Sequence, residues 1–169
     1  ADSAACGEIV YEIIQHLTAL TADIALPLYV AVSTDCGGFQ YGNTTARTHR
    51  IGAALMDVVD VAAVNKALFR TKSRVRLAME SRMVADMKLF DHQRVVVMEI
   101  PLSLRQEMQA TDADIEELSA LPALVEGTDC GVTLRELRPG TVKVSVRTGP
   151  RVDACALCRI LGGGGHHAA

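Results

Sequence analysis

Residues 131–149 read GVTLRELRPGTVKVSVRTG, and this stretch decides the fold of the second half of the chain. Two strand-like runs, 131–137 and 141–147, are joined by Arg138-Pro-Gly-Thr. Apolar and β-branched residues interrupted by a Pro-Gly pair are typical of two strands with a tight connection. The stretch therefore predicts an antiparallel hairpin.

The segments around this hairpin predict a small α+β domain with a mixed β-sheet. A helix is expected after it, over 152–161. Before it, the β-branched run 94–100 predicts a further strand that Pro101 ends. The sequence TDAD at 111–114 predicts a cap for a helix over 115–121, because acidic residues favour the positive end of the helix dipole.

The first half of the chain is predicted to be helical. Ser3 is expected to cap a helix over 4–20, and Asp23 one over 24–32. Residues 33–45, STDCGGFQYGNTT, predict a loop by their composition. Further helices are expected over 45–59, 60–69 and 73–89. The expected fold class is α/β, with a helical part over 1–70, a connector helix within 71–90 and an α+β domain over 91–169.

Composition excludes several classes of protein. The 169 residues are 49% hydrophobic and 22% charged, which favours a folded core over a disordered chain. A net charge of −3 argues against broad electrostatic binding of long nucleic acids. The longest apolar run, 24–32, is too short to cross a membrane. Five cysteines at uneven spacing do not predict a disulfide scaffold, so we expect a cytoplasmic protein with reduced thiols.

Asp35 is the first candidate for chemistry. It follows an apolar helix and precedes two glycines, an arrangement that suits a hard metal ion. The alternative is a loop aspartate in a local turn, with Asn43 and Thr44 capping the next helix. One carboxylate does not build a metal site, so the spacing alone leaves both interpretations open.

Two further segments could bind an anion. Gly162 to Gly165 follow a helix and precede His166, and successive N–H groups of glycines can form an anion-binding concavity. In the strand 142–149, alternation places Ser145 and Arg147 on one face, where a guanidinium matches phosphate oxygens. The alternatives are a flexible tail and a solvated strand face. The Cys155-Ala-Leu-Cys158 pair is interpreted as packing, since no second pair accompanies it.

Taken together, TDCGGFQYGNTT, VSVRTG and GGGGHHAA occur in the order found in the DHH phosphoesterase family. The sequence resembles the C-terminal half of the nanoRNase and pAp-phosphatase branch, which is related to RecJ-type exonucleases. That family reads approximately T-D-T-G-x-F, then S-x-R-S, then GGGGH. Here Cys36 stands where threonine is usual, and Thr148 replaces the second serine.

The resemblance implies a role for each matching residue. Asp35 would be a metal ligand, Ser145 and Arg147 would face the substrate, and Gly163, Gly164 and His166 would hold its terminal phosphate. The implied cofactor is manganese, with two ions in the complete enzyme. No catalytic residue is identified in this chain, because nothing in it matches the family's N-terminal D-x-D segment or its Asp-His-His signature. The family pattern also continues beyond Ala169, so we expect the last domain to be truncated.

The implied reaction is metal-dependent hydrolysis of phosphoesters in very short oligonucleotides, pAp or linear or cyclic dinucleotides. The isolated chain is expected to be inactive, and no membrane or long nucleic acid is expected as a partner; a homodimer is also considered. Two alternatives stay open at this point: a non-catalytic nucleotide-binding or regulatory module, and an interaction domain with a flexible glycine tail.

Overall fold

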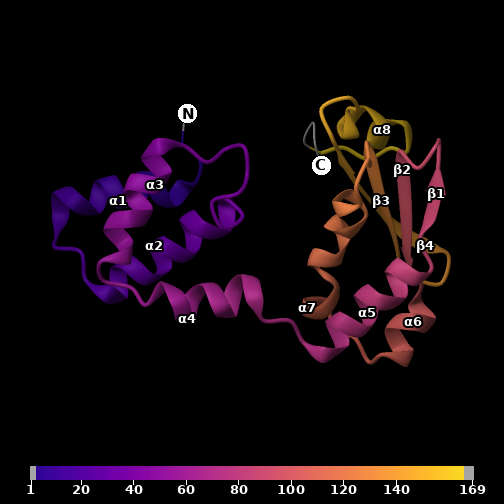
Figure 1. Cartoon of the computed structure of the whole chain (residues 1–169), viewed down its shortest axis with the longest axis horizontal. Coiled ribbons are helices and arrows are strands. Elements are labelled where there is room, and N and C mark those ends of the chain that lie inside the picture. Colours follow the sequence, from indigo (N-terminus) through magenta and orange to yellow (C-terminus); the bar gives the residue numbers. More distant parts are fainter. Residues whose placement is uncertain (1–2, 166–169) are drawn as a thin grey trace. The chain divides into compact units, whose positions relative to one another are not determined.

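A computed structural model describes residues 3–165 and divides the chain into two compact units. Unit 1 is Ala1–Thr71 and unit 2 is Lys72–Ala169. Each unit is described by itself (Figure 1). The expected α/β fold class is confirmed, since unit 1 is helical and unit 2 combines helices with a mixed sheet. No helix among the described residues is long and apolar enough to cross a membrane.

Unit 1 consists of helices packed around an aliphatic core. In chain order the helices are α1 (Cys6–Leu17), α2 (Ala22–Asp35), α3 (Ala46–Met56), α4 (Val61–Asn65) and the π-helix η1 (Lys66–Arg70). The core residues come mainly from α2 and α3; they are Ala5, Ala25, Leu28, Tyr29, Val32, Ile51 and Leu55. The helical pattern read from the sequence is confirmed, although Ile9, Ile13 and Leu17 of α1 stay exposed.

Three local predictions in unit 1 are wrong. The N-cap of α1 is Ala5 rather than Ser3, and the N-cap of α2 is Thr21 rather than Asp23. Residues 33–35 belong to α2 and not to the loop. The reason is that the hydroxyl of Thr34 donates to Val30 O at 2.8 Å. A polar side chain can thus be satisfied within a helix, which composition does not show.

Unit 2 is built on a four-stranded sheet with the order β1-β2-β3-β4. Its elements are α5 (Arg74–Ala85), β1 (Lys88–Phe90), β2 (Val95–Ile100), α6 (Leu102–Glu107), α7 (Asp112–Ile115), the 3-10 helix η2 (Glu117–Leu124), β3 (Cys130–Arg138), β4 (Thr141–Thr148) and α8 (Ala154–Ile160). β2 and β3 are parallel, whereas the other two pairs are antiparallel. The predicted hairpin and the strand at 94–100 are confirmed.

Some boundaries in unit 2 differ from the prediction. The helix expected over 73–89 ends at Ala85, because Lys88 and Leu89 pair with β2 as strand β1. The helix expected over 115–121 is α7 followed by η2, with Thr111 as the expected cap. α8 begins at Ala154 because the Asp153 side chain caps it, accepting from Ala156 N at 3.0 Å.

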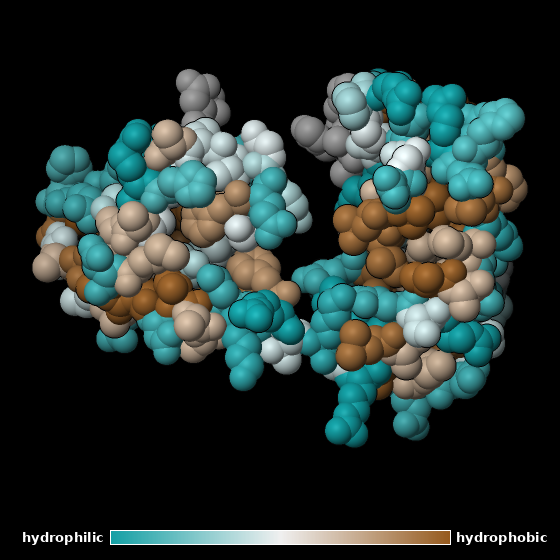
Figure 2. Space-filling view, viewed as in Figure 1, coloured by the Kyte–Doolittle hydropathy of each residue, from teal (hydrophilic) through white to brown (hydrophobic). Residues whose placement is uncertain are grey.

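The two faces of the sheet are covered differently. The crossover from β2 to β3, together with α5, packs on one face and forms the main core with Met79, Met83, Val96, Met98, Ile100 and Leu118. On the other face, Ala154 of α8 packs against Cys130 and Val146, with Cys158 beside them. Figure 1 shows α8 at the end of the sheet where β2 begins. Figure 2 shows hydrophobic side chains gathered over the strands of this unit.

Gly131 in β3 allows η2 to lie directly on the sheet. A Cβ at this position would lie 2.5 Å from the backbone nitrogen of Ala123. Backbone cannot move away as a flexible side chain can, so only glycine permits the observed approach. This glycine therefore sets how closely the crossover packs on the strands.

We predict that Gly131→Ala destabilises unit 2 by about 2 kcal/mol, because the added methyl group forces the crossover away from the sheet. Urea unfolding followed by circular dichroism measures the change. Gly149→Ala is the matched control: a Cβ there meets nothing within 4 Å, and we expect a change below about 0.5 kcal/mol. Equal stabilities of the two variants would contradict this account.

Candidate functional site

Asp35 is the last residue of α2, and its side chain is exposed. The chain then folds back on the final turn of the helix: Gly37 N donates to Thr34 O at 3.0 Å, and Gly38 N donates to Ser33 O at 2.7 Å. This tight turn fixes the direction of the backbone that follows Asp35.

The turn is strained at one residue. Gly37, Gly38 and Phe39 have φ angles of 55°, 68° and 68°. Glycine adopts this left-handed conformation freely, but Phe39 does so at a cost on the order of 1 kcal/mol. Its ring compensates by stacking on His49, with 5.3 Å between ring centroids, and by lying 6.3 Å from Tyr29. The packing of this ring holds the strained turn in place.

Asn43 ties the turn to the start of the chain. Its Nδ2 donates to Asp35 O at 3.1 Å and to Ala4 O at 3.2 Å. The helix that follows is capped by Thr45 in a capping box with Thr48, and not by Asn43 or Thr44 as the alternative interpretation proposed. Asn43 therefore joins the end of α2 to the segment before α1.

Glu8 is a fully buried carboxylate beneath this arrangement, and sequence reasoning missed it. It accepts hydrogen bonds from Thr48 Oγ1 at 2.5 Å and Ser3 Oγ at 2.8 Å, and Arg47 Nε lies 4.0 Å away. Burial by itself raises the pKa of Glu8, but these hydrogen bonds and Arg47 outweigh it, so the pKa falls below its ordinary value. The sequence did not indicate that Glu8 is buried, because Glu8 lies beside the apolar stripe of its helix and not within it.

Cys36 follows Asp35 and is buried. Burial raises the pKa of its thiol, so the sulfur stays protonated at neutral pH. The structure thus favours the interpretation of Cys36 as a packing residue. Within residues 3–165, no three His, Cys, Asp or Glu side chains gather as a metal site. Asp35 can therefore supply one metal ligand but does not form a site with other described residues.

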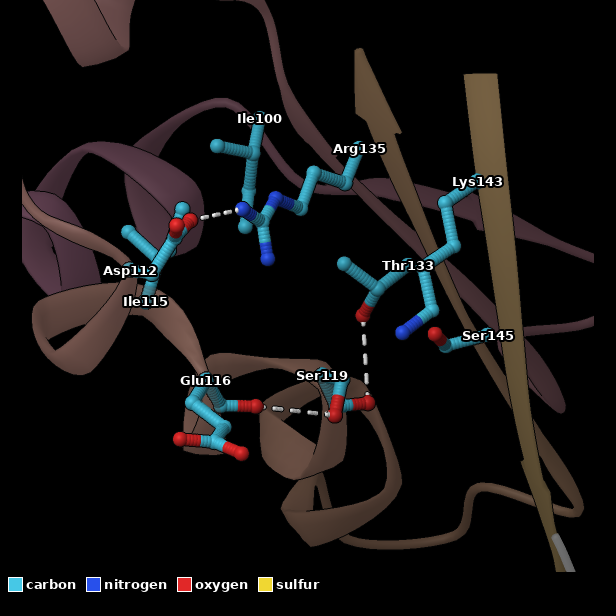
Figure 3. Close-up of a pocket in the computed structure, with 9 residues that line it drawn as sticks. All are labelled: Ile100, Asp112, Ile115, Glu116, Ser119, Thr133, Arg135, Lys143 and Ser145. Carbon is cyan, nitrogen blue, oxygen red and sulfur yellow. Dashed lines mark hydrogen bonds and ion pairs between the residues drawn. The ribbon is translucent and has the colours of Figure 1, made fainter. Parts of the chain in front are cut away.

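In unit 2, Ser145 lines a cavity of about 200 Å³ between the sheet and the crossover (Figure 3). Lys143 and Ser145 reach it from β4, and Thr133 and Arg135 from β3. The opposite wall carries Asp112, Glu116 and Ser119 from α7, its C-terminal end and η2. Ser145 therefore lies among both positive and negative side chains.

The charges in this cavity are unevenly satisfied. Asp112 pairs with Arg135 and, at 3.1 Å, with Arg105. Arg135 Nε is buried without a hydrogen-bond partner, and no ion pair within residues 3–165 involves Lys143. Thr133 Oγ1 donates to Ser119 O at 3.2 Å, which holds η2 on β3. Lys143 is thus the cation of this cavity that stays available to an anion.

Arg147 lies on the same face of β4 as Ser145, as the alternation predicts, opposite Gly131 in the register. It does not line the cavity. Its NH1 donates to Val146 O at 3.1 Å, and no ion pair within residues 3–165 involves its guanidinium. A half-buried guanidinium that is not paired with a carboxylate can bind an anionic ligand without first breaking an ion pair.

Asp129 fixes the chain after Arg147, and it too was missed from the sequence. This buried carboxylate accepts from Arg94 Nε at 2.7 Å and pairs with Arg151 at 2.8 Å, while its carbonyl accepts from Gly149 N at 3.0 Å. The hydrogen bond from Arg94 is the main cause that holds the pKa of Asp129 below its usual range. These contacts join the beginnings of β2 and β3 to the end of β4.

The glycine run begins where α8 ends. Gly163 N donates to Cys158 O at 2.9 Å, and Gly164 has open space around its Cα. His166 lies outside the described residues. The predicted convergence of Arg147, the glycines and His166 on one anion therefore stays a prediction.

No protein-family model matches the sequence. Over 166 residues, however, the chain is 32% identical to the bifunctional oligoribonuclease and PAP phosphatase NrnA of Thermus thermophilus. The chain is a homologue of NrnA. The match covers 96% of this chain and 49% of the relative, so the chain spans about half the length of the curated relative it matches.

A solved structure shows the same fold. An exopolyphosphatase-related protein from Bacteroides fragilis superposes with a TM-score of 0.88 at 20% identity, covering 99% of this chain and 50% of that one. The sequence identity confirms the predicted relationship to about half of a protein of the NrnA kind, and this structure confirms the fold. These comparisons show homology and fold, and they assign no role to an individual residue of this chain.

We predict that Glu8→Gln lowers the stability of unit 1 by about 2 kcal/mol at pH 7, since it removes a charge that accepts several hydrogen bonds. Because the folded-state pKa lies below the ordinary 4.5, the carboxylate contributes stability above that pH and loses it as the pH falls through the lowered value. In thermal melts, the difference in Tm between the parent and Glu8→Gln should therefore shrink as the pH falls below 4.5.

Glu12→Gln is the matched control, because Glu12 lies on the same helix and pairs with Arg47 at 2.7 Å but is exposed. We expect it to change stability by less than about 0.5 kcal/mol at pH 7. A parallel pH profile for Glu8→Gln and the parent would show that Glu8 is not the titrating group.

Proposed function

We propose that this chain supplies a phosphate clamp and one metal ligand to a metal-dependent phosphoesterase that hydrolyses very short oligonucleotides, pAp or dinucleotides. The observation that carries the proposal is the homology to NrnA over 96% of the chain, because that relative is named an oligoribonuclease and PAP phosphatase. In this proposal the chain corresponds to the C-terminal half: unit 1 ends the DHH domain, α5 connects, and unit 2 binds substrate.

Arg147 is the centre of the proposed clamp. Its guanidinium offers a planar pair of donors that matches phosphate oxygens, and it has no competing carboxylate among the described residues. Ser145 adds a hydroxyl on the same face, and the Gly164 N–H with His166 would add further donors, whereas the Gly163 N–H donates to Cys158 O and closes the end of α8. A single clamp of this kind suits the net charge of −3, which provides no track for a long nucleic acid.

Asp35 is the proposed metal ligand. Its exposed carboxylate at the end of a rigid helix is a hard oxygen donor, which suits manganese. The remaining ligands would come from the half of the relative that this chain does not match. When bound, the metal would activate water and neutralise phosphoryl charge. What this chain contributes is orientation: the Asn43 and Phe39 contacts fix the backbone turn from which the Asp35 side chain extends. A homodimer and a cytoplasmic location stay predictions.

We predict that the 169-residue chain binds pAp and that Arg147→Ala weakens this binding about tenfold or more, the loss of a charge-assisted pair of hydrogen bonds. Isothermal titration calorimetry measures both affinities. Arg138→Ala is the matched control, since Arg138 lies at the opposite end of the β3–β4 hairpin. Equal losses in both variants would indicate general electrostatics and contradict a clamp at Arg147.

We further predict that the chain with manganese releases no phosphate from pAp, because its described residues supply one metal ligand. In a protein that joins this chain to the ligands it lacks, Asp35→Ala should abolish kcat, whereas Arg147→Ala should mainly raise KM. Steady-state kinetics on pAp separates the two effects. Turnover by the chain alone, or the reverse pattern of effects, would overturn the assigned roles.

A further inference from the structure

Aromatic residues are few in this chain, yet most of them gather at the Asp35 turn. The sequence holds three Phe, three Tyr and no Trp. Four of the six lie around this turn: Tyr29, Phe39, Tyr41 and Phe69. This concentration of aromatic rings next to Asp35, the candidate metal ligand, needs a physical explanation.

The four rings divide into two pairs with different surroundings. Tyr29 is buried and Phe39 is half-buried, and their contacts stabilise the turn. Tyr41 and Phe69 are 62% and 41% exposed. Packing within unit 1 thus accounts for the first pair but leaves much of the second pair in water.

The two exposed rings rest on the glycines of the turn. A Cβ on Gly37 would lie 2.3 Å from the Tyr41 ring, and one on Gly38 would lie 3.8 Å from the Phe69 ring. Each ring therefore covers backbone directly after Asp35. The glycine at 37 is required for space as well as for its φ angle.

Phe69 is presented by an uncommon element. It lies in the π-helix η1, a rare conformation that is frequent at functional sites. Lys66 and Arg70 belong to the same five-residue segment. Exposed aromatic rings with cationic residues in the same segment suit a ligand that combines a planar ring with a phosphate.

We propose that Tyr41 and Phe69 stack a nucleobase of a nucleotide beside the Asp35 turn. This inference rests on the proposed function and names how the same site would bind the substrate's base. Stacking on a ring is tolerant of base identity, because every base has a π-face. The site would therefore accept short oligonucleotides without reading their sequence.

The test is an amide NMR titration of the 169-residue chain with adenosine and, separately, with ribose. Adenosine should shift the amide signals of Gly37 and Gly38 through the ring current of the stacked base, and ribose should not. Phe69→Leu and Tyr41→Leu should each weaken adenosine binding about fivefold or more. Phe69→Tyr and Tyr41→Phe keep a ring and should bind adenosine as the parent does.

Phe90→Leu is the matched control, because Phe90 is 53% exposed in β1 of unit 2. It should leave adenosine binding unchanged, and the amide spectra verify that every variant is folded. The inference is overturned if adenosine shifts neither glycine signal, or if Phe69→Leu and Tyr41→Leu bind it as tightly as Phe90→Leu does. Loss of pAp binding in Arg147→Ala together with either result would leave the proposed function standing without the stacking site.

Discussion

The parallel pairing of β2 with β3 is the constraint on which unit 2 depends. Two parallel strands cannot be joined by a tight turn, so the chain must cross over from the end of one to the start of the next. Here α6, α7 and η2 form that crossover and cover one face of the sheet. The cavity that Ser145 lines lies between this crossover and the strands β3 and β4.

A comparable constraint in unit 1 is the left-handed turn after α2. Two glycines and Phe39 turn the chain sharply. The contacts of the Phe39 ring with Tyr29 and His49 offset the backbone strain at Phe39. Asn43 fastens the same turn to the segment before α1, where Ala4 N also donates to the buried Glu8. An exposed Asp35 is thereby placed on a rigid support, an arrangement that suits a ligand better than a mobile loop would.

Both units place an unusual buried carboxylate where separate segments meet. Glu8 joins α1 to α3, and Asp129 joins the ends of three strands. In each case several donors satisfy the charge, and this lowers its pKa despite burial. The candidate residues are connected to these carboxylates. Asn43 links the backbone of Asp35 to Ala4, which donates to Glu8. Arg147 precedes the loop that Asp129 holds.

The sequence by itself determined most of the element types, the hairpin, the shared face of Ser145 and Arg147, and the homology to about half of NrnA. These follow from local periodicity, turn residues and short motifs, all of which act over a few neighbouring positions. Only the tertiary structure decided that Lys88 and Leu89 form a strand, that Glu8 and Asp129 are buried, and that Tyr41 and Phe69 stand on the glycines after Asp35. Except for the Tyr41 ring on Gly37, each of these depends on contacts between residues far apart in the sequence, whose free energies no local pattern contains.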